Sequence, residues 1–118
     1  MTTPQILEVR TQLLSPVRDF VKRDAIPQAA EHDENDTYPS ELFDQMAEMG
    51  LFGIKIPTEY GGLGLSQTNY MRLLSTVAKH CGSTVATLSA HQSIGVPQPL
   101  KLFGTKEQKE KYLPMLAK

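Results

Sequence analysis

The residues whose types could do chemistry are a glycine-rich run, three histidines and one cysteine. The run Gly61-Gly-Leu-Gly-Leu-Ser66 has the composition of a loop that cradles phosphate. It lacks the Gly-Lys-Ser/Thr ending of a nucleotide-binding loop, and no strand–helix–strand pattern surrounds it. We therefore interpret it as a turn in which several glycines adopt a positive φ.

The histidines and the cysteine form no pattern typical of a metal or catalytic site. His32, His80 and His91 have no His, Cys or carboxylate partner at metal-ligand spacing on their own helix faces. A polar contact inside a bundle is the favoured role for His91. Cys81 continues an apolar stripe with Leu74, which indicates a small core residue. The sequence therefore predicts no catalytic residue and no metal site in this chain.

Length and composition limit the class of protein to which the chain can belong. The 118 residues suit one domain spanning 1–118, and a net charge of -1 without a basic cluster argues against a nucleic-acid partner. A lone cysteine cannot form an internal disulfide, which favours a reducing, cytoplasmic location. We expect no secretory signal and no transmembrane segment, because no run of 18 apolar residues occurs.

The elements that must position any site follow a helical period. In the first segment the apolar side chains recur every three or four residues, at Ile6, Val9, Leu13, Val17, Phe20 and Val21. Pro16 predicts a kink or a restart of this helix. Pro27 is expected to open a short acidic stretch, and residues 31–36 are predicted to form a solvated helix end and loop.

The later helices are marked by capping residues. Ser40, Ser66 and Ser83 are predicted N-caps, and Thr105 with Gln108 has the spacing of a capping box. Gly50 is expected to end a helix in the left-handed conformation. Residues 52–57 are predicted to be extended, but they are too few to build a sheet. The sequence thus predicts an all-α bundle of about five or six helices.

One predicted helix carries no charge, because residues 80–100 contain no Asp, Glu, Lys or Arg. Val85, Ser89 and Gln92 share one of its faces. A helix that is small or apolar all round is expected to be buried all round. Two interpretations remain open here: a central helix packed tightly by its neighbours, or the wall of an elongated apolar cavity.

Four stretches together resemble the acyl-CoA dehydrogenase family. They are Pro39-Ser-Glu-Leu42, Met49-Gly-Leu-Phe-Gly-Ile54, Ile56-Pro-Thr-Glu-Tyr-Gly-Gly-Leu-Gly-Leu-Ser66 and Gly104-Thr-Lys-Glu-Gln-Lys-Glu-Lys-Tyr-Leu-Pro114. The order and spacing of these stretches carry the resemblance. Ala90-His-Gln-Ser-Ile-Gly95 with Leu102-Phe-Gly-Thr-Lys106 is most similar to the very-long-chain branch.

The resemblance implies an N-terminal helical domain whose middle β domain and C-terminal helical domain are absent. The family is flavin-dependent: FAD takes a hydride and a glutamate takes a proton from a fatty acyl-CoA during β-oxidation. Both groups are held by the absent domains, so this chain alone is expected to be inactive and to bind no FAD. The implied partners are fatty acyl-CoA, the chain's own middle and C-terminal domains, an electron-transfer flavoprotein and further copies in a homo-oligomer.

By the same resemblance, the uncharged helix helps to form the far end of the acyl pocket. The residues expected to line the acyl chain are Val85, Leu88, Ser89 and Gln92. The small side chains Val85 and Ser89 favour a long-chain substrate. Two alternatives stand beside this interpretation: a non-enzymatic helical module that binds a partner or a lipid, and the same domain of a flavin monooxygenase or an acyl-CoA oxidase.

Overall fold

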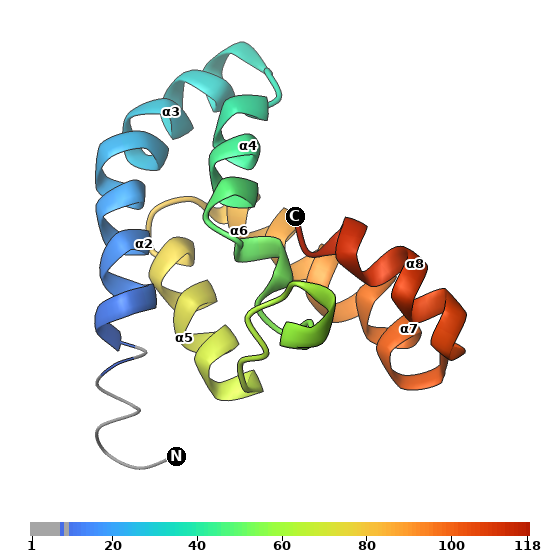
Figure 1. The fold of residues 1–118 in the computed structure, drawn as a ribbon. Helices are drawn as coiled ribbons and strands as arrows, with labels where there is room; N and C mark the ends of the chain where they lie inside the picture. The colour runs from blue at the N-terminus through green and yellow to red at the C-terminus, as the bar shows by residue number, and fades with distance from the viewer. Residues whose placement is uncertain (1–7, 9) are drawn as a thin grey trace.

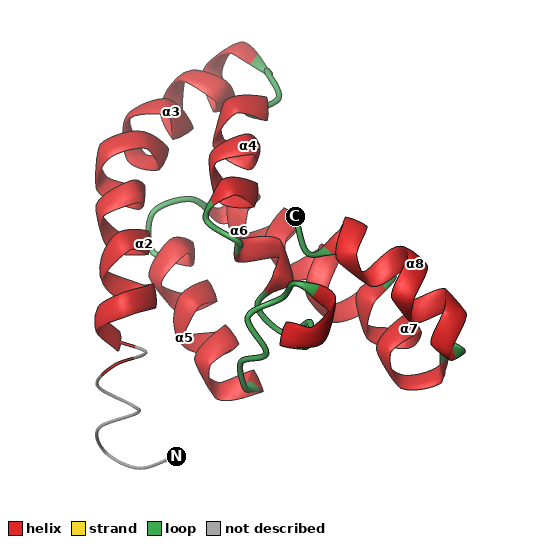
Figure 2. Cartoon of the chain, in the orientation of Figure 1, coloured by secondary structure: helices red, strands yellow, loops and turns green. Residues whose placement is uncertain are grey.

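The computed structural model describes Glu8 and residues 10–118 as helices joined by short loops (Figure 1, Figure 2). The α-helices are α2 (Ser15–Phe20), α3 (Ile26–Asn35), α4 (Ser40–Glu48), α5 (Gln67–Ala78), α6 (Gly82–Ser89), α7 (Pro97–Phe103) and α8 (Lys106–Leu116). Wider π-helical turns form η1 (Arg10–Leu14), η2 (Val21–Ala25) and η5 (Ala90–Ile94), and 3₁₀ turns form η3 (Leu51–Gly53) and η4 (Thr58–Tyr60). No strand occurs in the described residues, and the prediction of an all-α bundle is confirmed.

The first helical path continues past both of its prolines. The residues that flank α2 and precede α3 keep right-handed helical φ and ψ, so η1, α2, η2 and α3 follow one another without a break. Pro16 and Pro27 each occupy the second position after a π-turn, where the wider turn accommodates a residue that lacks an N–H donor. The acidic stretch at residues 31–36 contains the exposed last turn of α3 and its left-handed C-cap Asp36, so the predicted solvated helix end and loop are confirmed. Ile6 and Val9 of the predicted stripe lie outside the described residues.

Two of the predicted N-caps are confirmed and two are wrong. Ser66 accepts a hydrogen bond from the Asn69 backbone N–H, and Thr105 forms both hydrogen bonds of the predicted capping box. Ser40 is the first residue inside α4, after Pro39. The helix α6 begins at Gly82, so Cys81 rather than Ser83 precedes it. In both wrong cases the helix begins one or two residues earlier than the hydroxyl predicts.

The segment predicted to be extended is instead a compact series of turns. Residues 51–53 form η3, and the Ile56 N–H donates to the Gly53 carbonyl at 3.1 Å. The glycine-rich loop folds back onto this segment, where the Leu65 N–H donates to the Ile54 carbonyl at 2.8 Å. Gly61 and Gly64 have the predicted positive φ values, 84° and 61°. Gly50 has the predicted left-handed conformation at the end of α4.

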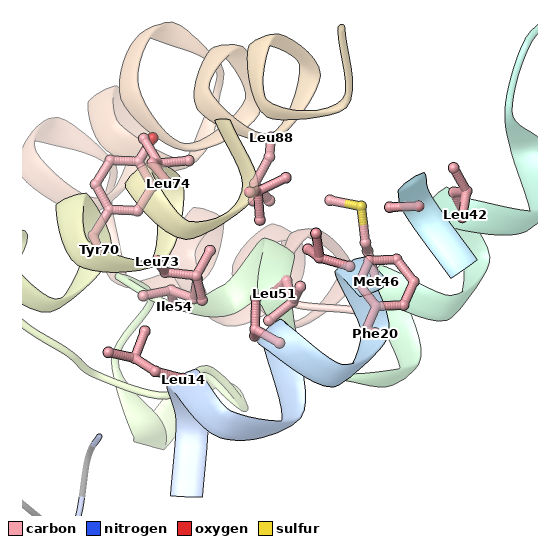
Figure 3. Packing of buried hydrophobic residues seen from close by; sticks show 14 residues of the cluster. Leu14, Phe20, Leu42, Met46, Leu51, Ile54, Tyr70, Leu73, Leu74 and Leu88 are labelled. Atoms are coloured by element: carbon pink, nitrogen blue, oxygen red, sulfur yellow. The ribbon is translucent and has the colours of Figure 1, made fainter. Parts of the chain in front are cut away.

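The main core lies between the N-terminal helical path, α4, α5 and α6 (Figure 3). Its fully buried side chains include one aromatic residue from each of two elements, Phe20 of α2 and Tyr70 of α5. Branched aliphatic side chains and Met46 fill the space around them. The prediction that apolar residues at helical spacing form the core therefore holds for the described part of the first stripe.

The helices α7 and α8 form a hairpin on the side of the molecule away from α2 and α3 (Figure 1). A second, smaller core holds this hairpin to the rest of the chain. It contains Ile56 from the turn segment with Leu113 and Ala117 from the end of α8. The turn segment therefore contributes Ile54 to the main core and Ile56 to the second core.

Candidate functional site

The uncharged segment is divided into α6, η5 and α7 and is only partly buried. The chain turns at Gly95, which is extended, and Pro97 starts α7 after this break. Thr84, Leu88 and Gln92 point into the molecule. The other face is exposed and carries Gly82, Ser83, Ala86, Thr87, Ala90, Ser93 and Ile94. The expectation that this helix is buried all round is therefore wrong for this chain, because nothing in the described residues covers the second face.

The four predicted acyl-lining residues divide into two pairs. Leu88 and Gln92 have 0 % and 2 % of their surface exposed, so they are enclosed by the chain's own helices. Val85 packs against the main core but is only half-buried, and Ser89 is also half-buried. Val85 and Ser89, one turn apart on α6, are thus the pair that retains surface for contact with a ligand.

Gln92 connects η5 to the turn segment through the interior. Its Nε2 donates to the Leu51 carbonyl at 2.6 Å across 41 residues of sequence. Its Oε1 is buried and has no hydrogen-bond partner among the described residues. An unpaired buried acceptor typically costs on the order of 1–3 kcal/mol. The Gln92 amide therefore fixes the position of η5. Its Oε1 remains without a partner beneath the exposed face of α6 and η5.

Two further polar contacts hold η5 in place. The His91 Nε2 donates to the Leu116 carbonyl at 3.0 Å, and the imidazole meets the Phe52 ring edge-on at 5.2 Å between centroids. The Tyr70 and Ser93 hydroxyl groups share a hydrogen bond of 2.8 Å. His91 thus makes the polar contact within the bundle that its sequence context favoured.

Cys81 lies at the start of α6 and packs as a small buried residue. Its Sγ lies 2.8 Å from Thr84 Oγ1 and 3.7 Å from Ser83 Oγ. Burial acts to raise the pKa of the thiol, but the hydrogen bonds from Thr84 and Ser83 together outweigh it and lower the pKa below 9.0. Among the described residues, no group of three or more His, Cys, Asp or Glu side chains could hold a metal ion. In the same part of the chain, no helix is long and apolar enough to cross a membrane.

Several large apolar side chains on η5, on α7 and α8 and in the turn before α7 are exposed, and the sequence-based search for a site did not identify them. Phe103 is 86 % exposed and Ile94 is 83 % exposed. The surface, here called the apolar rim, also includes Val96, Leu102 and Met115. The sequence signal for the apolar rim is that these large apolar residues fall outside the helical stripes of the predicted core. Exposed apolar surface of this kind is typical of an interface with another protein part.

We expect the apolar rim to cause the isolated chain to self-associate. The double change Ile94→Ser and Phe103→Ser should reduce this association, because it removes the two most exposed large side chains of the rim. Tyr38→Ser is the matched control, since Tyr38 is 70 % exposed but lies in the loop between α3 and α4. Light scattering over a range of concentrations measures the effect. A wild-type chain that stays monomeric at high concentration would contradict the prediction.

Comparison with known proteins places the chain among acyl-CoA dehydrogenases. Residues 8–118 match the family described as "Acyl-CoA dehydrogenase, N-terminal domain". The chain is 48% identical over 114 residues to "Probable acyl-CoA dehydrogenase FadE10" of Mycobacterium tuberculosis, covering 93% of this chain and 17% of the relative. It is 42% identical over 106 residues to "Very long-chain specific acyl-CoA dehydrogenase, mitochondrial" of Rattus norvegicus, covering 90% and 16%. The chain therefore spans about a sixth of the length of these curated relatives.

A solved structure shares the whole fold. It is described as "Electron transferring flavoprotein of Acidaminococcus fermentans: Towards a mechanism of flavin-based electron bifurcation". The superposition has a TM-score of 0.82 at 32% sequence identity and covers 99% of this chain and 29% of the matched chain. The helical arrangement described above is thus found as one part of a longer chain.

Proposed function

Because this chain belongs to the acyl-CoA dehydrogenase family, as its N-terminal domain, we propose that it forms one wall of the acyl pocket of a flavin-dependent fatty acyl-CoA dehydrogenase. The observation that carries this proposal is the exposed, uncharged face of α6 and η5. A solvated helix face normally carries charged residues. A face of small, neutral residues suits contact with an alkyl chain or with another protein part.

Val85 and Ser89 are the residues that we assign to the acyl chain. Both are small and half-buried, and they lie one turn apart on α6. Leu88 and Gln92 are enclosed behind them, so their part in the pocket is to support the wall. Space left by small side chains at the end of a pocket favours a long acyl chain. The 42% identity to a very-long-chain-specific relative supports the same preference.

The described residues do not fit a flavin nucleotide at the glycine-rich loop. A phosphate cradle needs open space above its glycines, but a side chain on Gly62 would run into the carbonyl group of Ile56. We therefore propose that FAD and the catalytic base are held by parts of the enzyme outside this chain. An electron-transfer flavoprotein as acceptor, a homo-oligomeric state, a role in β-oxidation and a cytoplasmic location belong to the same proposal.

A chimera tests whether the chain performs this role. Residues 8–118 would replace the matching segment of the Mycobacterium relative, with the unmodified relative as control. We expect the chimera to retain FAD and to reduce an artificial electron acceptor with fatty acyl-CoA. Activity with molecular oxygen in place of the acceptor would indicate an oxidase instead. A folded, flavin-loaded chimera that is inactive at every acyl length would contradict the proposal and favour a non-enzymatic binding module.

A further inference from the structure

Two lysines from distant parts of the chain converge beside the start of α5. Lys101 of α7 donates from its Nζ to the backbone carbonyl of Lys55 at 3.4 Å. The Lys55 Nζ donates to Gln67 Oε1 at 3.3 Å and lies 4.4 Å from the centre of the Tyr70 ring. Both lysines are half-buried. The fold therefore places the Lys101 ammonium against the backbone of Lys55, across 46 residues of sequence, and close enough for its charge to act on the Lys55 side chain.

Among the described residues, neither lysine forms an ion pair that would balance its charge. Burial, and then the positive charge of Lys101, lower the pKa of Lys55 below 10.5. Like charges in a half-buried position disfavour each other unless an anion lies between them. The oxygen and ring contacts of Lys55 offset only part of this cost.

We propose that Lys55 and Lys101 form a binding site for a diphosphate group. Each ammonium has three N–H donors, and each uses one in its oxygen contact. Several donors therefore remain for an oxyanion. Two point charges suit the two neighbouring phosphoryl groups of a diphosphate, each of which carries at least one negative charge, whereas a single carboxylate supplies only one. The Gln67 side chain is exposed, and its Nε2 can add a neutral donor beside them.

The site differs from the glycine-rich loop, where the Ile56 carbonyl closes the space at Gly62. It uses side-chain donors from η3–η4, α5 and α7 and needs no helix N-terminus. Coenzyme A and free diphosphate both carry the diphosphate group. The inference does not depend on the acyl-pocket proposal, since it requires neither Val85 nor Ser89.

Titration of the 118-residue chain with inorganic diphosphate tests the site, with the lysine ¹³Cε signals observed by NMR. We expect the Lys55 and Lys101 signals to move together and the pKa of Lys55 to rise when diphosphate is bound. Lys55→Gln and Lys101→Gln should each weaken binding by about tenfold. The control Lys106→Gln, which removes an exposed lysine on α8, should leave binding unchanged.

A parallel titration with coenzyme A identifies the source of the diphosphate group. Tighter binding of coenzyme A than of inorganic diphosphate would support the site and name its ligand. Equal binding of the two would support a site for the free ion. Equal loss of affinity in Lys106→Gln and in Lys55→Gln would show non-specific attraction and overturn the proposal. Binding of the dicarboxylate glutarate as tightly as diphosphate would also overturn it.

Discussion

Replacing Ser89 with phenylalanine in the enzyme that carries this domain is expected to lower kcat/KM for the longest acyl-CoA substrates by roughly thirty- to hundredfold. Each methylene buried in an apolar pocket contributes about 0.8 kcal/mol, so loss of room for three or four methylenes costs about 2–3 kcal/mol. Short substrates do not reach this part of the pocket and should be little affected. The half-buried position of Ser89 on α6 leaves the added ring free to point toward the pocket.

The measurement is kcat/KM against a ladder of acyl-CoA lengths, with the chimera described above as the enzyme. Ser89→Ala is the matched control, because it removes the hydroxyl and leaves the space open, and its profile should resemble that of the parent. Ser89→Phe should also lower thermal stability modestly. If Ser89 is part of the helix packing alone, the ring overpacks the bundle and lowers every rate equally. Parallel profiles would therefore remove Ser89 from the pocket.

Replacing Gly62 with alanine is expected to destabilise the chain by about 3 kcal/mol or more. A Cβ at this position would overlap the Ile56 carbonyl oxygen and lie 2.6 Å from the Ile56 carbonyl carbon and Cβ. Backbone atoms cannot rotate away as a flexible side chain would. Ile56 packs with Leu113 and Ala117, so its displacement also loosens the end of α8. Urea unfolding measures the loss as a lower midpoint.

Two other glycines provide matched controls for this substitution. Gly82 has open space at its Cβ position and an ordinary φ at the start of α6, so Gly82→Ala should be neutral or stabilise by up to about 1 kcal/mol. Gly61 also has open space but a φ of 84°, so Gly61→Ala should cost about 1–2 kcal/mol from backbone strain alone. Equal midpoints for all three variants would contradict the overlap at Gly62.

The sequence by itself identified most of the residues from which the candidate site is proposed. The absence of charge over residues 80–100 identified the segment, and the helical period placed Val85 and Ser89 on one face. Periodicity does not state which neighbours cover a helix. The helix α5 and the turn segment pack against only one side of α6 and η5. This packing encloses Leu88 and Gln92 and leaves the opposite face, with Ala86, exposed.

Local chemistry determined the helices, the caps at Ser66 and Thr105 and the left-handed glycines, because each depends on atoms within a few residues. The tertiary structure alone decided the rest. The helix continues through Pro27 because Val21 and Ala25 of the preceding π-turn are buried in the main core. Residues 51–56 coil because Ile54 and Ile56 must reach two separate cores. The convergence of Lys55 and Lys101 joins positions 46 residues apart, and no pattern within either segment specifies such a contact.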